Sequence, residues 1–156
     1  MRVDELMTRH VQVCGMHDNA HRAAELMWRF DVGCLPVVDV DHRITGVVTD
    51  RDICMAAYTQ GRPLCEIPIG HCMSVNVHTV HMNDSLQRAE KIMQDRQVHR
   101  LPVVDAAQQL VGMISLNDIV LASRRQFKDP ALRIENVAAT FGAICEHRLP
   151  AAAAHP

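Results

Sequence analysis

Two neighbouring stretches of sequence decide the fold: VGCLPVVD at residues 32–39 and, after a four-residue turn, ITGVVTDRDI at residues 44–53. Sixty-six residues further along the chain, the same pattern returns as VHRLPVVD at residues 98–105 and LVGMISLNDI at residues 110–119. In each case an apolar run that contains Leu-Pro-Val-Val-Asp precedes a second apolar run. The second run ends with the motif Thr/Ser-x-x-Asp-Ile. A pattern that recurs at a constant spacing predicts a repeated structural unit.

The repeat extends well beyond these stretches. Residues 7–53 align with residues 73–119 without a gap, and 16 of the 47 aligned pairs are identical. Unrelated segments would share roughly three identities at the background frequencies of the common residues. The chain is therefore a tandem duplication, and we expect its function to depend on what the two copies form together.

Each copy is predicted to fold in the order β-α-β-β-α. Alternating β-branched residues indicate short strands, apolar residues three and four apart indicate a helix, and near-continuous apolar runs indicate strands covered on both faces. In the first copy we expect a strand at 11–14, a helix capped by Asp18 and ending near Asp31, strands at 35–39 and 44–48, and a helix from Thr49 to Gly61. In the second we expect a strand at 77–80, a helix at 84–96 with Asp84 and Gln87 as its capping pair, strands at 101–105 and 110–115, and a helix from Ser115.

The fold class predicted from this order is α/β, with two small sheets and helices on one side of each. A strand, a crossover helix and a parallel strand require a right-handed connection. Each copy has only about fifty core residues, which is marginal for independent stability, so we expect the copies to pack on each other with pseudo-two-fold symmetry. The expected division is repeat one at 1–62, a linker at 63–72, repeat two at 73–127, a C-terminal helix at 128–148 opened by Asp129 and Pro130, and a disordered tail at 149–156.

Composition excludes several classes of protein. The formal charge of −2 and the aromatic content of 3% argue against a general nucleic-acid binder, which needs basic patches and stacking platforms. No run approaches the roughly 18 apolar residues of a membrane span, and the amino terminus lacks the apolar core of a signal peptide, so we expect a cytoplasmic protein without membrane contact. The six cysteines form no Cys-x-x-Cys pair and are expected to be free thiols.

The repeated motif carries a resemblance to a known family. Met-Thr or Met-Ser near the start of each copy, the Leu-Pro-Val-Val-Asp strand and the Gly-x-x-Thr/Ser-x-x-Asp-Ile junction resemble the cystathionine-β-synthase (CBS) domain. Two copies in tandem resemble the Bateman module, a regulatory unit that binds adenosine-containing ligands, and the match covers residues 1–127. The resemblance implies a stand-alone, bacterial-type CBS protein that binds AMP, ADP, ATP or an S-adenosylmethionine-type ligand between its repeats.

The strand-to-helix junctions Thr49-x-x-Asp52 and Ser115-x-x-Asp118 have two compatible roles. As helix N-caps, the hydroxyl accepts a backbone N–H and the acid three residues on suits the positive helix end. The same helix end can hold phosphate or ribose oxygens, and the aspartate can accept two hydrogen bonds from a vicinal diol. The resemblance implies that the Asp contacts the ribose hydroxyls while the Thr or Ser lies near ribose or phosphate.

The sharpest difference between the copies is His99-Arg100, which takes the place of Gly33-Cys34. A guanidinium is the preferred partner of phosphate, and the His-Arg-Leu-Pro run resembles the phosphate-contacting segment of nucleotide-sensing CBS proteins. The alternative for Arg100 is simple extension to solvent ahead of a buried strand. Copy one lacks this charge, so we expect its cleft to be a poorer anion site or a site for a different ligand. Arg51 either compensates or forms a surface ion pair, and the sequence does not separate the two.

The first strand of each copy completes the expected site. In the family these strands offer backbone groups to an adenine edge while aliphatic side chains sandwich the ring, although as core strands they need no ligand. The expected ligand-binding set is Val11, Val13, Leu35, Pro36, Thr49, Arg51, Asp52, Val77, Thr79, His99, Arg100, Leu101, Pro102, Ser115 and Asp118.

Metal binding and catalysis find little support in the sequence. The cluster Cys65, His71, Cys72, His78 and His81 fits no recognised zinc spacing, so no metal ligands are assigned. No Ser-His-Asp or Cys-His set and no Gly-x-x-x-x-Gly-Lys phosphate loop is readable, so we expect neither an enzyme nor a required cofactor.

Two functions from different classes remain open. The first is a nucleotide sensor that signals by conformational change, through self-association or to an unknown protein partner; the second is a structural interaction protein with empty or vestigial clefts. Retained Asp52 and Asp118 favour the sensor, whereas Gly33 and Cys34 favour loss of one cleft. Apolar helix faces predict a homodimer of about 35 kDa, twice the 17.5 kDa chain mass. A single pair of copies is expected to cover these faces only in part, and their residues are Ile53, Met55, Ala56, Ala57, Ile119, Val120 and Leu121.

Overall fold

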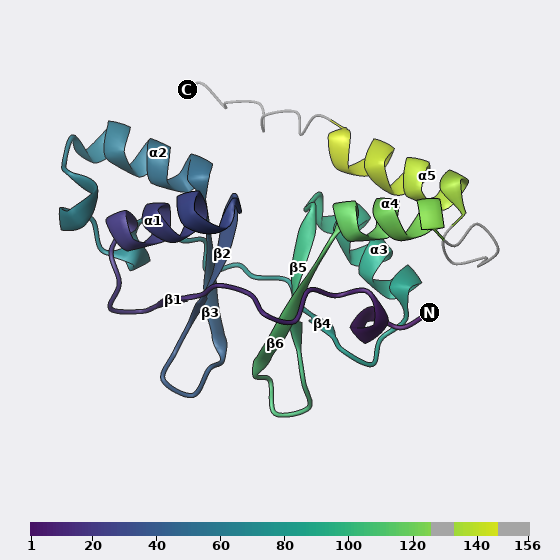
Figure 1. Cartoon of the computed structure of the whole chain (residues 1–156). Helices are drawn as coiled ribbons and strands as arrows, with labels where there is room; N and C mark the ends of the chain where they lie inside the picture. The colour runs from purple at the N-terminus through teal and green to yellow at the C-terminus, as the bar shows by residue number, and fades with distance from the viewer. Residues whose placement is uncertain (126–132, 147–156) are drawn as a thin grey trace, which may run out of the picture.

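The computed structural model describes residues 1–125 and 133–146 as two similar halves whose sheets lie side by side at the centre of the molecule, with helices above them (Figure 1). Each half has a three-stranded sheet, ordered β1-β2-β3 or β4-β5-β6, in which the first pair is parallel and the second antiparallel. The predicted β-α-β-β-α order and the α/β class are confirmed in both halves.

Repeat one contains β1 (Cys14–Gly15), α1 (Ala20–Phe30), β2 (Cys34–Val38), β3 (Ile44–Thr49) and α2 (Asp50–Gln60). Repeat two contains β4 (Val80–His81), α3 (Leu86–Arg96), β5 (Arg100–Val104), β6 (Leu110–Ser115) and α4 (Leu116–Arg125), followed by α5 (Ile134–Cys145). Short 3-10 turns lie at η1 (Val3–Glu5), η2 (Leu64–Glu66) and η3 (Ile69–His71).

The cap of α1 differs from the prediction by one residue. Asn19 is the N-cap, and its side-chain oxygen accepts the backbone N–H of Arg22 at 3.0 Å. Asp18 instead accepts the N–H of Gly15 at 2.7 Å and closes the turn after β1. The prediction of Asp18 as the cap was therefore wrong, because its carboxylate is used by the preceding turn.

The second copy repeats this arrangement. Ser85 caps α3 by accepting the N–H of Arg88, while Asp84 accepts the N–H of His81 at 3.0 Å. The predicted capping pair of Asp84 and Gln87 was wrong for the same physical reason.

The first strand of each copy is shorter than predicted and begins later, because residues 11–13 and 77–79 are not part of a strand. β1 pairs with β2 only at Cys14 and Gly15, and β4 pairs with β5 only at Val80 and His81. The remaining strand boundaries agree with the structure within one residue. The predicted C-terminal helix corresponds to α5, which begins at Ile134; its expected opening pair at 129–130 and the tail at 149–156 lie outside the described residues.

The repeats exchange the segments that precede them. Val3 and Met7 are buried in the core of repeat two, and Ile67 and Ile69 are buried in the core of repeat one. The segment before the first strand of repeat one therefore completes the core of repeat two, and the segment before the first strand of repeat two completes the core of repeat one. This interdependence agrees with the marginal size of a single copy. The sequence analysis did not foresee this exchange.

Backbone hydrogen bonds hold the exchanged segments in place. Thr8 and Met113 exchange both N–H···O=C bonds, at 2.8 and 2.9 Å. Ser74 and Val47 are the equivalents of Thr8 and Met113 in the duplication, and they exchange the same two bonds at 2.8 and 3.0 Å. Both exchanges therefore follow one pattern, and each sets the path of the chain entering its first strand.

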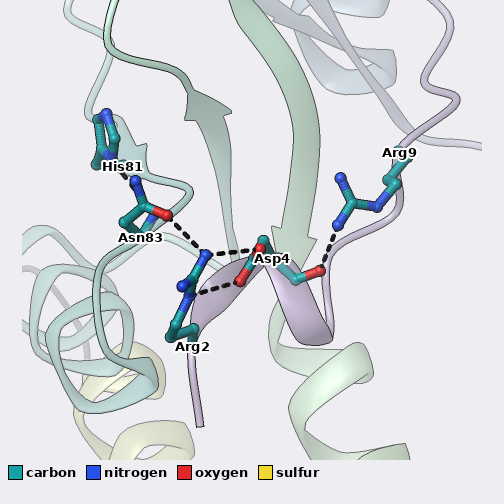
Figure 2. Close-up of polar contacts among 5 residues, drawn as sticks. All are labelled: Arg2, Asp4, Arg9, His81 and Asn83. Atoms are coloured by element: carbon teal, nitrogen blue, oxygen red, sulfur yellow. Dashed lines mark hydrogen bonds and ion pairs between the residues drawn. The ribbon is translucent and has the colours of Figure 1, made fainter.

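Polar side chains fix the start of the chain against repeat two (Figure 2). Arg2 forms a two-point pair with Asp4, at 3.0 and 2.9 Å, and its Nη2 also donates to Oδ1 of Asn83 at 2.6 Å. Arg9 Nη2 donates to the carbonyl oxygen of Asp4 at 2.9 Å. Exposed ion pairs contribute little to stability, so these contacts position the start of the chain on repeat two and add little to the free energy of folding.

The apolar helix faces are covered in part, as predicted. Ile53, Ala56 and Ile119 are buried in the two cores, whereas Met55 and Leu121 are about half exposed. In repeat two, α5 lies over α3 and α4 (Figure 1). The groove between α1 and α2 is open instead, and Trp28 beside it is 91% exposed.

Candidate ligand-binding site

A cavity of about 580 Å³ lies between the repeats, where β2 and β5 begin. Stretches from four distant parts of the chain and one residue of α5 line it. They are Thr8, His10, Val11 and Gln12; residues 30–36; His99 and Arg100; Met113 and residues 115–118; and Phe141. A concave site with aliphatic walls and a few convergent polar groups is typical of small-molecule recognition.

Gly112 allows the amino-terminal segment to form one wall of this cavity. A Cβ atom at this position would lie 2.7 Å from the carbonyl oxygen of Thr8 and 3.0 Å from the sulfur of Met7. Any larger residue would therefore push the segment away from β6. The equivalent Gly46 has Met73 close by in the same way, which explains why both copies have glycine at this place in the motif.

Helix α4 begins at the cavity with a reciprocal capping box. The backbone N–H and the hydroxyl of Ser115 donate to Oδ2 of Asp118 at 2.8 and 2.7 Å, and the N–H of Asp118 donates back to the hydroxyl at 3.3 Å. Within the described parts of the chain, the other carboxylate oxygen of Asp118, Oδ1, accepts no hydrogen bond. One oxygen thus caps the helix and the other is available to a ligand.

Arg100 brings a positive charge to the same cavity. It is the first residue of β5 and lies directly opposite Ser115 in the β5–β6 ladder. Cys34, the first residue of β2, is near it: burial raises the pKa of the Cys34 thiol to about 11, and the Arg100 guanidinium partly offsets that rise. The side chains of His99 and Arg100 are exposed, so both can meet an anionic group that enters the cleft.

The corresponding junction of repeat one has similar geometry, but Cys34 takes the place of Arg100 and a second carboxylate is present. Thr49 donates to Oδ2 of Asp52 from its N–H at 2.9 Å and from its hydroxyl at 2.6 Å. Asp50 adds a second carboxylate, whose Oδ2 would lie 3.1 Å from a Cβ atom at Gly33. Both acids act to raise the pKa of the Cys34 thiol. An anion is less favoured at this acidic junction than beside Arg100.

The cavity collects about half of the residues predicted to bind a ligand. Val11, Leu35, Pro36, His99, Arg100, Ser115 and Asp118 line it. Val13, Thr49, Arg51, Asp52, Val77, Thr79, Leu101 and Pro102 do not. Within this second set, Thr49, Asp52, Val77 and Thr79 occupy positions equivalent to Ser115, Asp118, Val11 and Val13.

Several residues of the cavity were not found by sequence reasoning. Thr8, His10 and Gln12 reach it through the segment exchange, for which the repeated glycine at position 112 was the available signal. Phe30 ends α1, and Phe141 lies on α5, beyond the duplicated region. Nothing in the repeat pattern points to Phe141.

Two further observations limit the chemistry of the described residues. Among residues 1–125 and 133–146, no group of three or more His, Cys, Asp or Glu side chains is arranged to hold a metal ion. In the same part of the chain, no helix has the length and apolar character needed to cross a bilayer.

The fold and the cleft define a tandem α/β repeat module, and comparison with known proteins gives its family. The CBS domain model matches the chain twice, at residues 3–58 and 69–125. The CBS domain-containing protein YhcV of Bacillus subtilis is 34% identical over 119 residues, covering 76% of this chain and 83% of the relative. The chain belongs to the CBS domain family.

Solved structures extend the similarity over both repeats. The crystal structure of CBSX2 in complex with AMP superimposes with a TM-score of 0.71 at 26% identity, covering 81% of this chain and 98% of that one. The crystal structure of Hypoxic Response Protein I with two coordinated zinc ions gives a TM-score of 0.70 at 30% identity, covering 76% of this chain and 96% of that one.

Proposed function

We propose that the protein is a regulatory module that binds an adenine nucleotide in the cleft between its repeats. The observation that carries this proposal is that Arg100 and Asp118 line one cavity: a cation suited to phosphate, and a carboxylate with an available oxygen. The volume of about 580 Å³ lies within the roughly 300–1,000 Å³ of small-molecule sites. The AMP held by CBSX2, a structural relative, supports the same class of ligand.

Each part of the nucleotide has a matching group in the cleft. Oδ1 of Asp118 accepts hydrogen bonds from the two ribose hydroxyls while Oδ2 stays in the capping box, so binding does not disturb the helix cap. The phosphate pairs with the Arg100 guanidinium, whose paired N–H groups match two phosphate oxygens. Val11, Leu35 and Pro36 provide aliphatic surface for the base.

The charge of the cleft selects among adenosine-containing ligands. S-adenosylmethionine carries a sulfonium cation, which Arg100 repels, whereas AMP, ADP and ATP carry phosphate. The junction of repeat one has Asp50 and Asp52 on either side of Arg51, and the neutral Cys34 takes the place of Arg100. The proposal is therefore one nucleoside phosphate per chain, bound on the Asp118 side.

The ligand regulates the protein and is not transformed by it. Burial raises the pKa of the Cys34 thiol to about 11, so this thiol is protonated at neutral pH and is not an activated nucleophile. No cofactor or metal ion is required for binding. A response to the ligand then passes to a protein partner or through self-association in the cytoplasm.

Self-association is proposed through the α1–α2 face. Trp28 and Tyr58 are 91% and 81% exposed there. Gln94, the repeat equivalent of Trp28, is bonded to Thr140 of α5, so the matching groove of repeat two is already filled. A two-fold pairing of α1–α2 faces gives a homodimer of about 35 kDa, twice the 17.5 kDa chain.

Calorimetric titration of ligand-free protein with AMP, ADP, ATP, S-adenosylmethionine and adenosine tests the proposal. We expect one nucleoside phosphate per chain, bound more tightly than adenosine or S-adenosylmethionine. If none of the five binds at millimolar concentration, the protein is instead a structural interaction protein whose clefts are vestigial, with the exposed Trp28 and Tyr58 as its contact surface.

A further inference from the structure

Helix α5 lies outside both matched repeats and nevertheless reaches the cleft. The second match to the CBS domain ends at residue 125, whereas α5 spans Ile134–Cys145. Its residue Phe141 is part of the cavity lining. We propose that Phe141 contacts the bound nucleotide and that α5 is the element through which occupancy of the cleft is transmitted. This inference rests on the proposed function.

One face of α5 is anchored on repeat two. Val137, Thr140 and Ile144 are spaced three and four residues apart and are all buried. The Thr140 hydroxyl accepts a hydrogen bond from Nε2 of Gln94 at 2.8 Å. Nε2 of Gln97 donates to the carbonyl oxygen of Glu146, just after the end of the helix, at 2.9 Å. These contacts hold α5 on α3 and α4 (Figure 1).

Phe141 lies outside this anchored face. It follows Thr140 by one residue, a rotation of about 100° around the helix, and it is 54% exposed. Phe30 lines the same cavity from the end of α1, so the cleft has one aromatic ring from repeat one and one from α5. A half-exposed phenyl ring gains both apolar burial and ring packing when an adenine base or ribose covers it.

The position of α4 links Phe141 to the rest of the ligand. Asp118 lies in the first turn of α4, and α5 packs on α4. A nucleotide held by Asp118 that also contacts Phe141 therefore connects α4 and α5 through the cleft. By thermodynamic linkage, if the docked position of α5 raises nucleotide affinity by some factor, the nucleotide favours the docked position by the same factor.

The test compares Phe141→Ala and Phe141→Leu with Leu121→Ala. Leu121 is a matched control because it is 50% exposed on α4 and does not line the cavity. We expect Phe141→Ala to bind AMP about five- to tenfold more weakly, the change that corresponds to about 1 kcal/mol. Phe141→Leu should lie between wild type and Phe141→Ala, and Leu121→Ala should bind as wild type.

Amide hydrogen exchange supplies the second readout. AMP should slow exchange in α5 of wild type and of Leu121→Ala, and should slow it less in Phe141→Ala. If wild type binds AMP, but both Phe141 variants bind it equally well and α5 exchange is unchanged, the inference is overturned while the proposed function stands. If wild type binds no nucleotide, the proposed function itself has failed. Phe141→Leu preserves apolar packing, so it decides the matter should Phe141→Ala lose its fold.

Discussion

Asp118 stabilises the start of α4 through Oδ2 and is proposed to bind the ribose through Oδ1. Replacing it with alanine tests whether these two roles can be separated. The variant loses the two hydrogen bonds from Ser115 to Oδ2 but keeps the hydrogen bond from the backbone N–H of residue 118 to the Ser115 hydroxyl. Loss of this half of the capping box and of the acid in the first helical turn costs about 1 kcal/mol of stability at most. Asp52→Ala is the matched control, since Thr49 and Asp52 form the same capping box at the start of α2 and do not line the cavity.

Nucleotide affinity should separate the two variants. Hydrogen bonds to a charged acceptor are worth about 1.5–3 kcal/mol, which corresponds to a roughly 10- to 140-fold weaker Kd. We expect this loss for Asp118→Ala, because Oδ1 is the proposed ribose acceptor, and less than twofold for Asp52→Ala. Urea denaturation should show both variants destabilised by similar amounts.

The assay is calorimetry with AMP at a temperature where all three proteins are folded. Equal losses of AMP affinity in Asp118→Ala and Asp52→Ala would mean that Asp118 acts only through the fold. Unchanged affinity in Asp118→Ala would remove it from the ligand site.

Four further predictions follow from the structure. Arg100→Ala should weaken AMP binding far more than adenosine binding, and raised salt should reduce the difference; equal losses would show that Arg100 reads no charge. Gly112→Ala should cost roughly 1–3 kcal/mol in thermal or urea unfolding and weaken AMP binding, because its Cβ would meet Thr8. Gly70→Ala is the control and should be neutral, because its Cβ would meet no described residue within 4 Å. Glu90 is 4% exposed, its Oε1 has no hydrogen-bond partner among residues 1–125 and 133–146, and burial raises its pKa. As pH rises above the usual Glu pKa, the folded protein therefore binds more protons than the unfolded chain. The free energy of unfolding should fall over that range. Glu90→Gln should for this reason be more stabilising at pH 7 than at pH 4. Light scattering should show Trp28→Glu as a monomer and Val40→Glu, changed at an equally exposed hairpin residue, still as a dimer.

The repeated strands could be predicted because their information is local. The Leu-Pro-Val-Val run of each copy is almost fully buried, and such a run has few alternatives to a covered strand. The capping boxes of Thr49 and Ser115 were readable for the same reason, because donor and acceptor are three residues apart. Asp18 was misassigned because Asn19, one residue further, competes for the same helix end.

The rest of the site depends on contacts between residues distant in sequence. Thr8 reaches Met113 across more than one hundred residues, and only Gly112 marks where that approach occurs. Phe141 joins the cavity through the packing of α5 on α3 and α4, which no feature of the duplication encodes. The duplication also made the Thr49–Asp52 and Ser115–Asp118 junctions look alike in sequence. In the structure Ser115 and Asp118 line the cavity, whereas Thr49 and Asp52 do not.

A crystal structure of the full chain grown with AMP tests the central claim most directly. The account predicts one nucleotide per chain between the repeats, with its ribose hydroxyls hydrogen-bonded to Oδ1 of Asp118 and its phosphate on the Arg100 guanidinium. AMP bound instead at the Thr49–Asp52 junction, or an empty cleft at saturating AMP, would contradict it.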